Sequence, residues 1–134
     1  MSDMLQVTVV RKEWNGNTLD RVYASVLLDD HGNRCCLGFA ARSAGVPDFE
    51  LRGMCYIHNI YYEIPSSLRL LIKADSIKGS CQSPVSQQLT QANDGVHDTD
   101  PLAPRVPIFT TLAEKEAFII AKGREAGIEF TFID

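Results

Sequence analysis

Hydrophobic and polar residues alternate near both ends of the chain. Residues 4–12 (MLQVTVVRK) and 128–132 (IEFTF) each show the two-residue period of a β-strand. Residues 21–28 (RVYASVLL) predict a further strand, and the Asn-Gly-Asn sequence at 15–17 supplies a turn before it. This spacing predicts that the strands at 4–12 and 21–28 pair in an antiparallel way.

Apolar residues at helical spacing predict two helices between the strands. The first covers residues 36–44 and stops at Gly45, which suits a left-handed helix C-cap. The second begins with Ser83 as the N-cap and Pro84 at the first helical position, and it runs to about Ala92.

The rest of the chain adds further elements. The Thr-Leu-Ala-Glu sequence that begins at Thr111 has the spacing of a capping box and predicts a helix over 111–126. Residues 54–62 predict a strand, and the Pro-Ser-Ser sequence at 65–67 predicts the start of a short helix over 68–72. The pattern as a whole predicts one α+β domain over residues 1–134, with a small antiparallel or mixed sheet and about three to four helices.

The composition predicts a globular protein that works in the cytoplasm. Of the 134 residues, 45% are hydrophobic, which is enough to form a core without disulfides. No apolar run is long enough to cross a membrane, and the N-terminus lacks the features of a signal peptide. The 13 basic and 17 acidic residues give a net charge of −4, whereas proteins that bind nucleic acid polymers usually show a basic excess.

The sequence carries no familiar catalytic, cofactor or metal motif. Phosphate-binding glycine loops and nucleophile elbows are absent, and the histidines do not have the spacing of zinc ligands: His31, His58 and His97. Adjacent cysteines at 35 and 36 do not suit a disulfide with each other, and we expect them to pack in the core. We therefore predict no catalytic residue, no cofactor and no metal.

Two features are candidates for ligand binding, each with a structural alternative. Trp14 lies near Arg11 at a predicted strand end and would either stack on a base or cover the core beneath a turn. Asn93 and Asp94 would either offer donors and acceptors to a polar ligand or simply end a helix.

The predicted last helix also carries basic residues. Lys115, Lys122 and Arg124 could contact phosphate groups, although a solvated helix face carries such charges routinely. The predicted ligand-binding residues combine the three features: Arg11, Trp14, Asn93, Asp94, Lys122 and Arg124.

Several motifs together resemble a group of small bacteriophage proteins that includes the Thoeris anti-defence sponge family. They are Trp14 followed by Leu27-Leu28, the Gly-Asn-Arg-Cys-Cys-Leu-Gly-Phe run at 32–39, Asn-Asp-Gly at 93–95, and Gly-Ile-Glu-Phe-Thr-Phe at 127–132. The resemblance spans most of the chain, and the Cys-Cys-Leu-Gly-Phe run is its most distinctive part.

The resemblance implies a function. Such sponges bind a cyclic ADP-ribose isomer made by a host immune enzyme and sequester it in the host cytoplasm without destroying it. Asn93 and Asp94 match the family's Asn-Asp motif, and Lys122 and Arg124 lie on the last helix, where such proteins carry basic contacts. Several sponges are homo-oligomers that bind at subunit interfaces. This chain departs from the pattern in its long, proline-containing stretch over 95–110.

Two other functions stay open. One is a phage protein that inhibits a host defence protein directly, in the manner of an anti-CRISPR. It needs an exposed aromatic or acidic patch, which could come from Trp14, Tyr56, Tyr61 and Tyr62. The other is a small nucleotide-processing enzyme in which a cysteine or histidine performs the chemistry.

Overall fold

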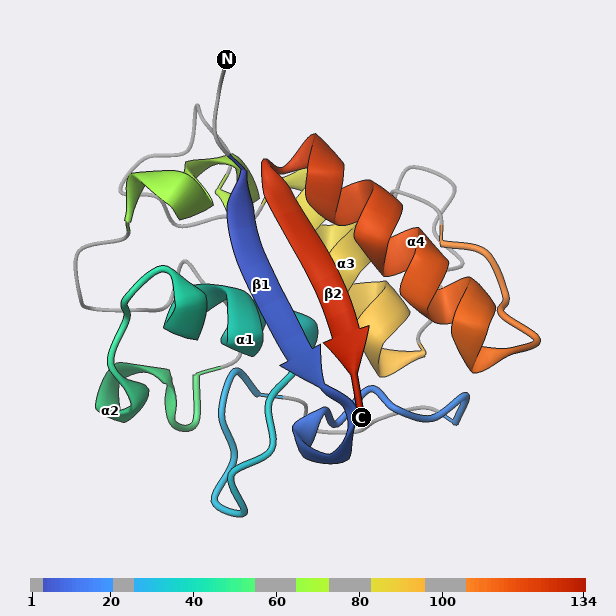
Figure 1. The fold of residues 1–134 in the computed structure, drawn as a ribbon, viewed down its shortest axis with the longest axis horizontal. Coiled ribbons are helices and arrows are strands. Elements are labelled where there is room, and N and C mark those ends of the chain that lie inside the picture. The colour runs from blue at the N-terminus through green and yellow to red at the C-terminus, as the bar shows by residue number, and fades with distance from the viewer. Residues whose placement is uncertain (1–3, 21–25, 55–64, 73–82, 96–105) are drawn as a thin grey trace.

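The computed structural model describes residues 4–20, 26–54, 65–72, 83–95 and 106–134 (Figure 1). Within them lie two β-strands, four α-helices and two 3-10 segments. In chain order these are β1 (Leu5–Val10), η1 (Arg11–Glu13), α1 (Cys36–Ser43), α2 (Asp48–Leu51), η3 (Ser66–Leu71), α3 (Pro84–Asp94), α4 (Leu112–Glu125) and β2 (Ile128–Ile133). The protein is therefore of the α+β class, as predicted.

The two predicted terminal strands are confirmed, except that residues 11 and 12 of the first lie in η1. The predicted antiparallel pairing is wrong. β1 pairs with β2 in parallel, in a register that runs from Leu5 opposite Ile128 to Val10 opposite Ile133. Parallel neighbours need a long crossover connection, and here nearly the whole chain lies between them. Local turn signals cannot reveal such a pairing, because the partners are at opposite ends of the sequence.

The predicted strand at 21–28 is only partly within the described residues. Residues 21–25 lie outside them, and Leu28 makes an isolated bridge with Arg52 rather than a strand ladder. The predicted strand at 54–62 lies outside the described residues except for its first residue.

Side chains on the sheet alternate between the core and solvent. Val7 and Val9 of β1, and Ile128 and Phe130 of β2, are buried, whereas Thr8 on the opposite face is exposed. Figure 1 shows α1 and α3 behind the strands and α4 running beside β2. The helices therefore cover one face of the sheet and leave the other toward solvent.

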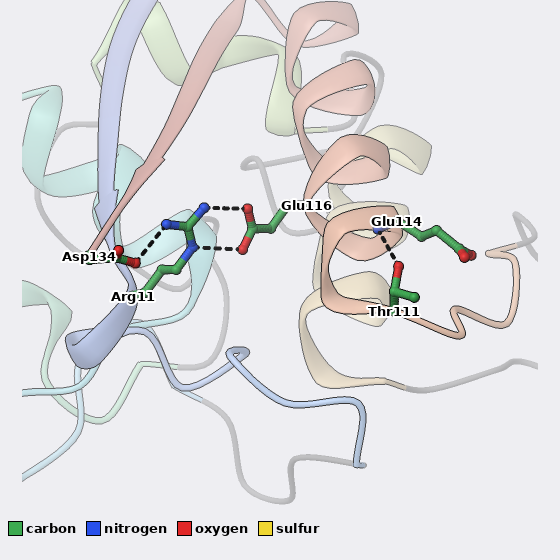
Figure 2. Close-up of polar contacts among 5 residues, drawn as sticks. All are labelled: Arg11, Thr111, Glu114, Glu116 and Asp134. Carbon is green, nitrogen blue, oxygen red and sulfur yellow. Dashed lines mark hydrogen bonds and ion pairs between the residues drawn. The ribbon is translucent and has the colours of Figure 1, made fainter.

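The capping signals place the ends of α3 and α4. Ser83 accepts a hydrogen bond from the Ser86 N–H at 3.3 Å, and Gly95 ends α3 with a φ of 68°. Thr111 accepts from the Glu114 N–H at 3.1 Å and so begins α4 (Figure 2). These predicted helices and α1 are confirmed. The Glu114 side chain bonds to Thr110 instead of completing the capping box.

Two short elements differ from the prediction. The helix predicted over 68–72 is a 3-10 segment over residues 66–71, which buries Leu68 and Leu71 at its three-residue repeat. The turn of helix α2 follows Pro47 and was not predicted, because four residues are too few to show a helical period.

The core reaches from the sheet into α1. Cys35 is 7% exposed and Cys36 is fully buried, which confirms the prediction that both pack in the core. A Cβ atom at Gly38 would lie 1.9 Å from the Leu27 carbonyl oxygen, so only glycine allows α1 to approach this segment. In the described part of the chain, no helix is both long enough and apolar enough to cross a membrane.

Candidate functional site

An open hollow of about 360 Å³ lies between α4 and β2. We call it the α4–β2 hollow. Its wall combines charged residues from the helix and η1 with aromatic residues from the strand: Arg11, Glu116, Ile120, Arg124, Glu129, Phe130, Thr131 and Phe132. Its volume falls within the roughly 300–1,000 Å³ of small-molecule sites.

Helical periodicity places three of these residues on one face of α4. Glu116, Ile120 and Arg124 follow one another at intervals of four, which puts their side chains in a row along the helix. All three line the α4–β2 hollow.

The neighbouring row on α4 turns inward. Lys115, Ile119 and Gly123 are buried, again at intervals of four. A Cβ atom at Gly123 would lie 2.5 Å from the Phe130 ring, so glycine is what lets β2 pack closely against α4. The two rows together make α4 the shared wall of the core and the hollow.

Arg11 joins three parts of the fold at one end of the hollow (Figure 2). Its Nε and Nη2 atoms donate to the two Glu116 carboxylate oxygens at 2.9 and 2.8 Å, and Nη1 donates to Asp134 at 2.9 Å. These hydrogen bonds raise the pKa of Arg11 beyond its already high range. The guanidinium therefore stays charged at any pH at which the protein is folded.

Arg124 forms a second, more exposed ion pair at the hollow. Its Nε and Nη2 atoms donate to Glu129 at 2.9 and 3.3 Å, and its side chain is 58% exposed. A guanidinium has five N–H donors, so Glu129 leaves several of them for a ligand.

Aromatic residues connect the hollow to the interior. The Phe132 ring lines the hollow and lies 4.8 Å from the Trp14 ring, at an interplanar angle of 52°. Trp14 itself is only 4% exposed. It therefore covers the core, which was the alternative to stacking on a base, and its ring meets the lining of the hollow at Phe132.

Asn93 is the centre of a buried hydrogen-bond network, which we call the Asn93 junction and define by Trp14, Cys36, Asn93 and Lys115. Its Oδ1 atom accepts from Trp14 Nε1 at 2.6 Å and from the Cys36 N–H at 2.9 Å. Its Nδ2 atom donates to Asn15 at 2.9 Å and to Asp94 at 3.0 Å. The fully buried side chain thus makes two hydrogen bonds through Oδ1 and two through Nδ2. It joins α1, α3 and the turn after η1.

Lys115 completes the Asn93 junction from α4. Its Nζ atom donates to the backbone oxygens of Thr18 and Asn93, both at 2.8 Å, and lies 5.5 Å from the centre of the Trp14 ring. The residue is 1% exposed. Burial lowers the pKa of Lys115 to about 8, because the charged form loses its hydration.

The two cysteines of α1 lie in an environment that suppresses ionisation. Burial raises the pKa of Cys35 to about 12 and that of Cys36 well above its ordinary value. Both are therefore thiols at neutral pH, whereas a cysteine nucleophile must be a thiolate. In the described ranges, no group of three or more histidine, cysteine or acidic side chains is placed to hold a metal ion.

The structure separates the six predicted binding residues into three places. Arg11 and Arg124 share the α4–β2 hollow. Trp14 and Asn93 lie inside the protein, next to the half-buried Asp94. Lys122 pairs with Glu125 at 3.0 Å on α4 and does not line the hollow. The ligand-binding role of each residue stays a prediction.

Other predicted features lie outside the described residues. These are three tyrosines of the aromatic patch and two of the histidines: Tyr56, Tyr61, Tyr62, His58 and His97.

Comparison with known proteins gives no assignment. No protein-family model matches the chain, and neither the curated proteins nor the solved structures include a significant match. The function must therefore be inferred from the site itself and from the motifs of the sequence.

Sequence reasoning missed several residues of the site. Glu116 and Ile120 could have been found from their four-residue spacing before Arg124. No local sequence pattern predicts that Phe132 and Arg11 lie close together, because this depends on the parallel pairing of the two ends of the chain.

Proposed function

We propose that this protein is a phage anti-defence protein that binds a cyclic nucleotide signal of the cyclic ADP-ribose type and sequesters it without cleaving it. The α4–β2 hollow is the proposed binding site. The observation that carries this proposal is the presence of Arg11 and Arg124, from opposite ends of the sequence, beside the Phe132 ring in one hollow.

The chemistry of the hollow suits a phosphate-bearing, flat ligand. Guanidinium groups bind phosphate oxygens through paired N–H donors, and aromatic rings offer a surface on which a base can stack. Arg124 is the better phosphate ligand of the two, because its ion pair with Glu129 is exposed and therefore weak. Arg11 supplies a fixed positive charge through its bidentate bond to Glu116.

The carboxylates of the hollow set a limit on affinity. Glu116 and Glu129 balance the two arginines, so a dianionic ligand must compete with them for the guanidinium groups. A second copy of the chain that covers the open hollow would exclude water and strengthen the contacts with phosphate. We therefore include a homo-oligomer, with the ligand at its interface, in the proposal.

The test is a thermal-shift screen against cyclic ADP-ribose isomers and cyclic di- and trinucleotides. A ligand at about a hundred times its dissociation constant adds roughly 2.7 kcal/mol to the free energy of unfolding, which raises the melting temperature by several degrees. We expect such a shift for the native protein and for Arg42→Ala, a control on α1 outside the hollow, but not for Arg124→Ala. Ligand released by boiling should have its original mass.

Each other result has a defined meaning. Release of a product in place of the ligand would favour the hypothesis of a nucleotide-processing enzyme. Equal thermal shifts for Arg42→Ala and Arg124→Ala would mean that the ligand binds outside the hollow. If no nucleotide shifts the melting temperature, the proposal fails.

Direct inhibition of a host defence protein is the second candidate. It is favoured by Phe49 of α2, whose side chain is 76% exposed, since exposed aromatic residues are common anchors at protein interfaces. Phe49→Ser should then weaken binding to the host protein and leave nucleotide binding unchanged.

A further inference from the structure

A second, smaller cavity shares no lining residue with the α4–β2 hollow. It has a volume of about 70 Å³ and is lined by Leu19, Gly95, Ile108, Phe109 and Lys115. Leu19 and Ile108 are 46% and 75% exposed, whereas Lys115 is 1% exposed. The cavity therefore leads from an apolar surface to the buried Lys115 side chain, whose Nζ atom donates to the backbone oxygen of Thr18, the neighbour of Leu19.

The hydrogen bonds of Lys115 are compatible with a neutral amine. Nζ donates to the backbone oxygens of Thr18 and Asn93. A neutral amine has two N–H groups and one lone pair, so it can keep both bonds while the lone pair stays free for reaction. Neither bond to a carbonyl oxygen requires the ammonium form.

From this geometry we propose that Lys115 is a carbonyl-binding residue that forms a reversible Schiff base with a small aliphatic aldehyde or ketone. The Nζ lone pair attacks the carbonyl carbon to give a carbinolamine, whose hydroxyl then leaves with a proton as water. A C=N bond replaces the C=O bond, one water is released, and no oxidant or metal is needed. Hydrolysis returns the amine and the carbonyl compound.

The lining of the cavity selects the class of carbonyl compound. Water occupies about 30 Å³ per molecule in the liquid, so the cavity holds only a group of a few atoms. Leu19, Ile108 and Phe109 offer apolar contact at its mouth, which suits a short alkyl chain and disfavours a charged group. A longer chain would extend outward over Leu19 and Ile108.

The protonation of Lys115 supports this chemistry. With a pKa of about 8, roughly a tenth of the amine is neutral at pH 7, compared with fewer than about one in a thousand for an ordinary lysine. Asp94 favours the charged form of Lys115, and burial outweighs this effect.

The experiment is reductive trapping with propanal and cyanoborohydride at pH 7, followed by peptide mass mapping. In the folded protein we expect Lys115 to be alkylated at least tenfold faster than the exposed Lys12. In 8 M urea the preference should disappear, because the cavity no longer exists. Lys115→Arg should remove the fast phase and leave the slow labelling of the other lysines unchanged.

The outcome separates a reactive amine from a purely structural one. If Lys115 only caps the C-terminal end of α3 through the Asn93 carbonyl, its burial will make it slower to react than Lys12. Labelling of Lys115 at or below the rate of Lys12 in the folded protein overturns the proposal. The test uses no nucleotide, so it is independent of the proposed function.

Discussion

The Asn93 junction and the α4–β2 hollow lie on either side of the Trp14–Phe132 contact and use polar residues in opposite ways. At the junction, Asn93 and Lys115 are buried, and their bonds run to the backbone and to fixed side chains. At the hollow, Arg11 and Arg124 form ion pairs with side chains that solvent can reach.

The difference in burial changes what each polar group contributes. An unsatisfied donor or acceptor in the interior costs about 1–3 kcal/mol, because water cannot replace the lost partner. An exposed ion pair contributes about 0–1 kcal/mol, since water solvates each partner when the other is removed. The junction should therefore control stability, whereas at the hollow the exposed Arg124–Glu129 pair is free to exchange Glu129 for a ligand.

The strongest test of this division is Asn93→Ala. The substitution leaves Trp14 Nε1 and the Cys36 N–H without their acceptor in the core. Two lost buried partners and a small cavity should lower the free energy of unfolding by about 3–5 kcal/mol. Urea denaturation followed by circular dichroism would measure the change.

The matched control for Asn93→Ala is Gln87→Ala on the same helix. Gln87 is only half-buried, so its loss should cost less than about 1 kcal/mol. Equal effects of the two substitutions would contradict the central role of the Asn93 junction.

The second test uses the pH dependence of stability at Lys115. Below about pH 8 the amine is protonated in both states, and folding bears the full cost of burying the charge. Between pH 8 and the ordinary value of 10.5 the unfolded chain binds more protons, so this group makes the free energy of unfolding rise with pH. The total rise should be roughly 3–4 kcal/mol, at about 1.4 kcal/mol per pH unit between pH 8 and 10.5.

Lys115→Met isolates this contribution. Cys35 acts in the opposite direction above pH 9, because burial raises its pKa and the folded chain then binds more protons. The native protein should therefore gain stability relative to Lys115→Met as the pH rises from 8 to 10. Parallel curves for the two proteins would show that Lys115 keeps its ordinary pKa.

The sequence predicted the elements of the fold better than their arrangement. Helix caps such as Ser83 and Thr111, and the alternation in β1 and β2, act within a few residues and were interpreted correctly. The parallel pairing of the first and last strands depends on contacts across the whole chain. No local pattern contains that information, which is why the antiparallel prediction failed.

The same limit applies to the candidate site. Arg11 and Arg124 were chosen for their charge, but only the fold brings them to one hollow. Asn93 was chosen for its hydrogen-bonding groups, and the fold directs those groups inward to Trp14 and Cys36. Residue chemistry alone cannot tell a ligand contact from a core contact, because burial decides between them.

The smallest expected effect on stability is that of Arg124→Ala. The arginine side chain is 58% exposed and its partner Glu129 can be hydrated in its absence, so the free energy of unfolding should fall by less than about 1 kcal/mol. The same substitution should abolish the ligand-induced thermal shift, since Arg124 is the proposed phosphate contact. A loss of stability as large as that of Asn93→Ala would mean that Arg124 supports the fold, and the two regions would then differ in location but not in role.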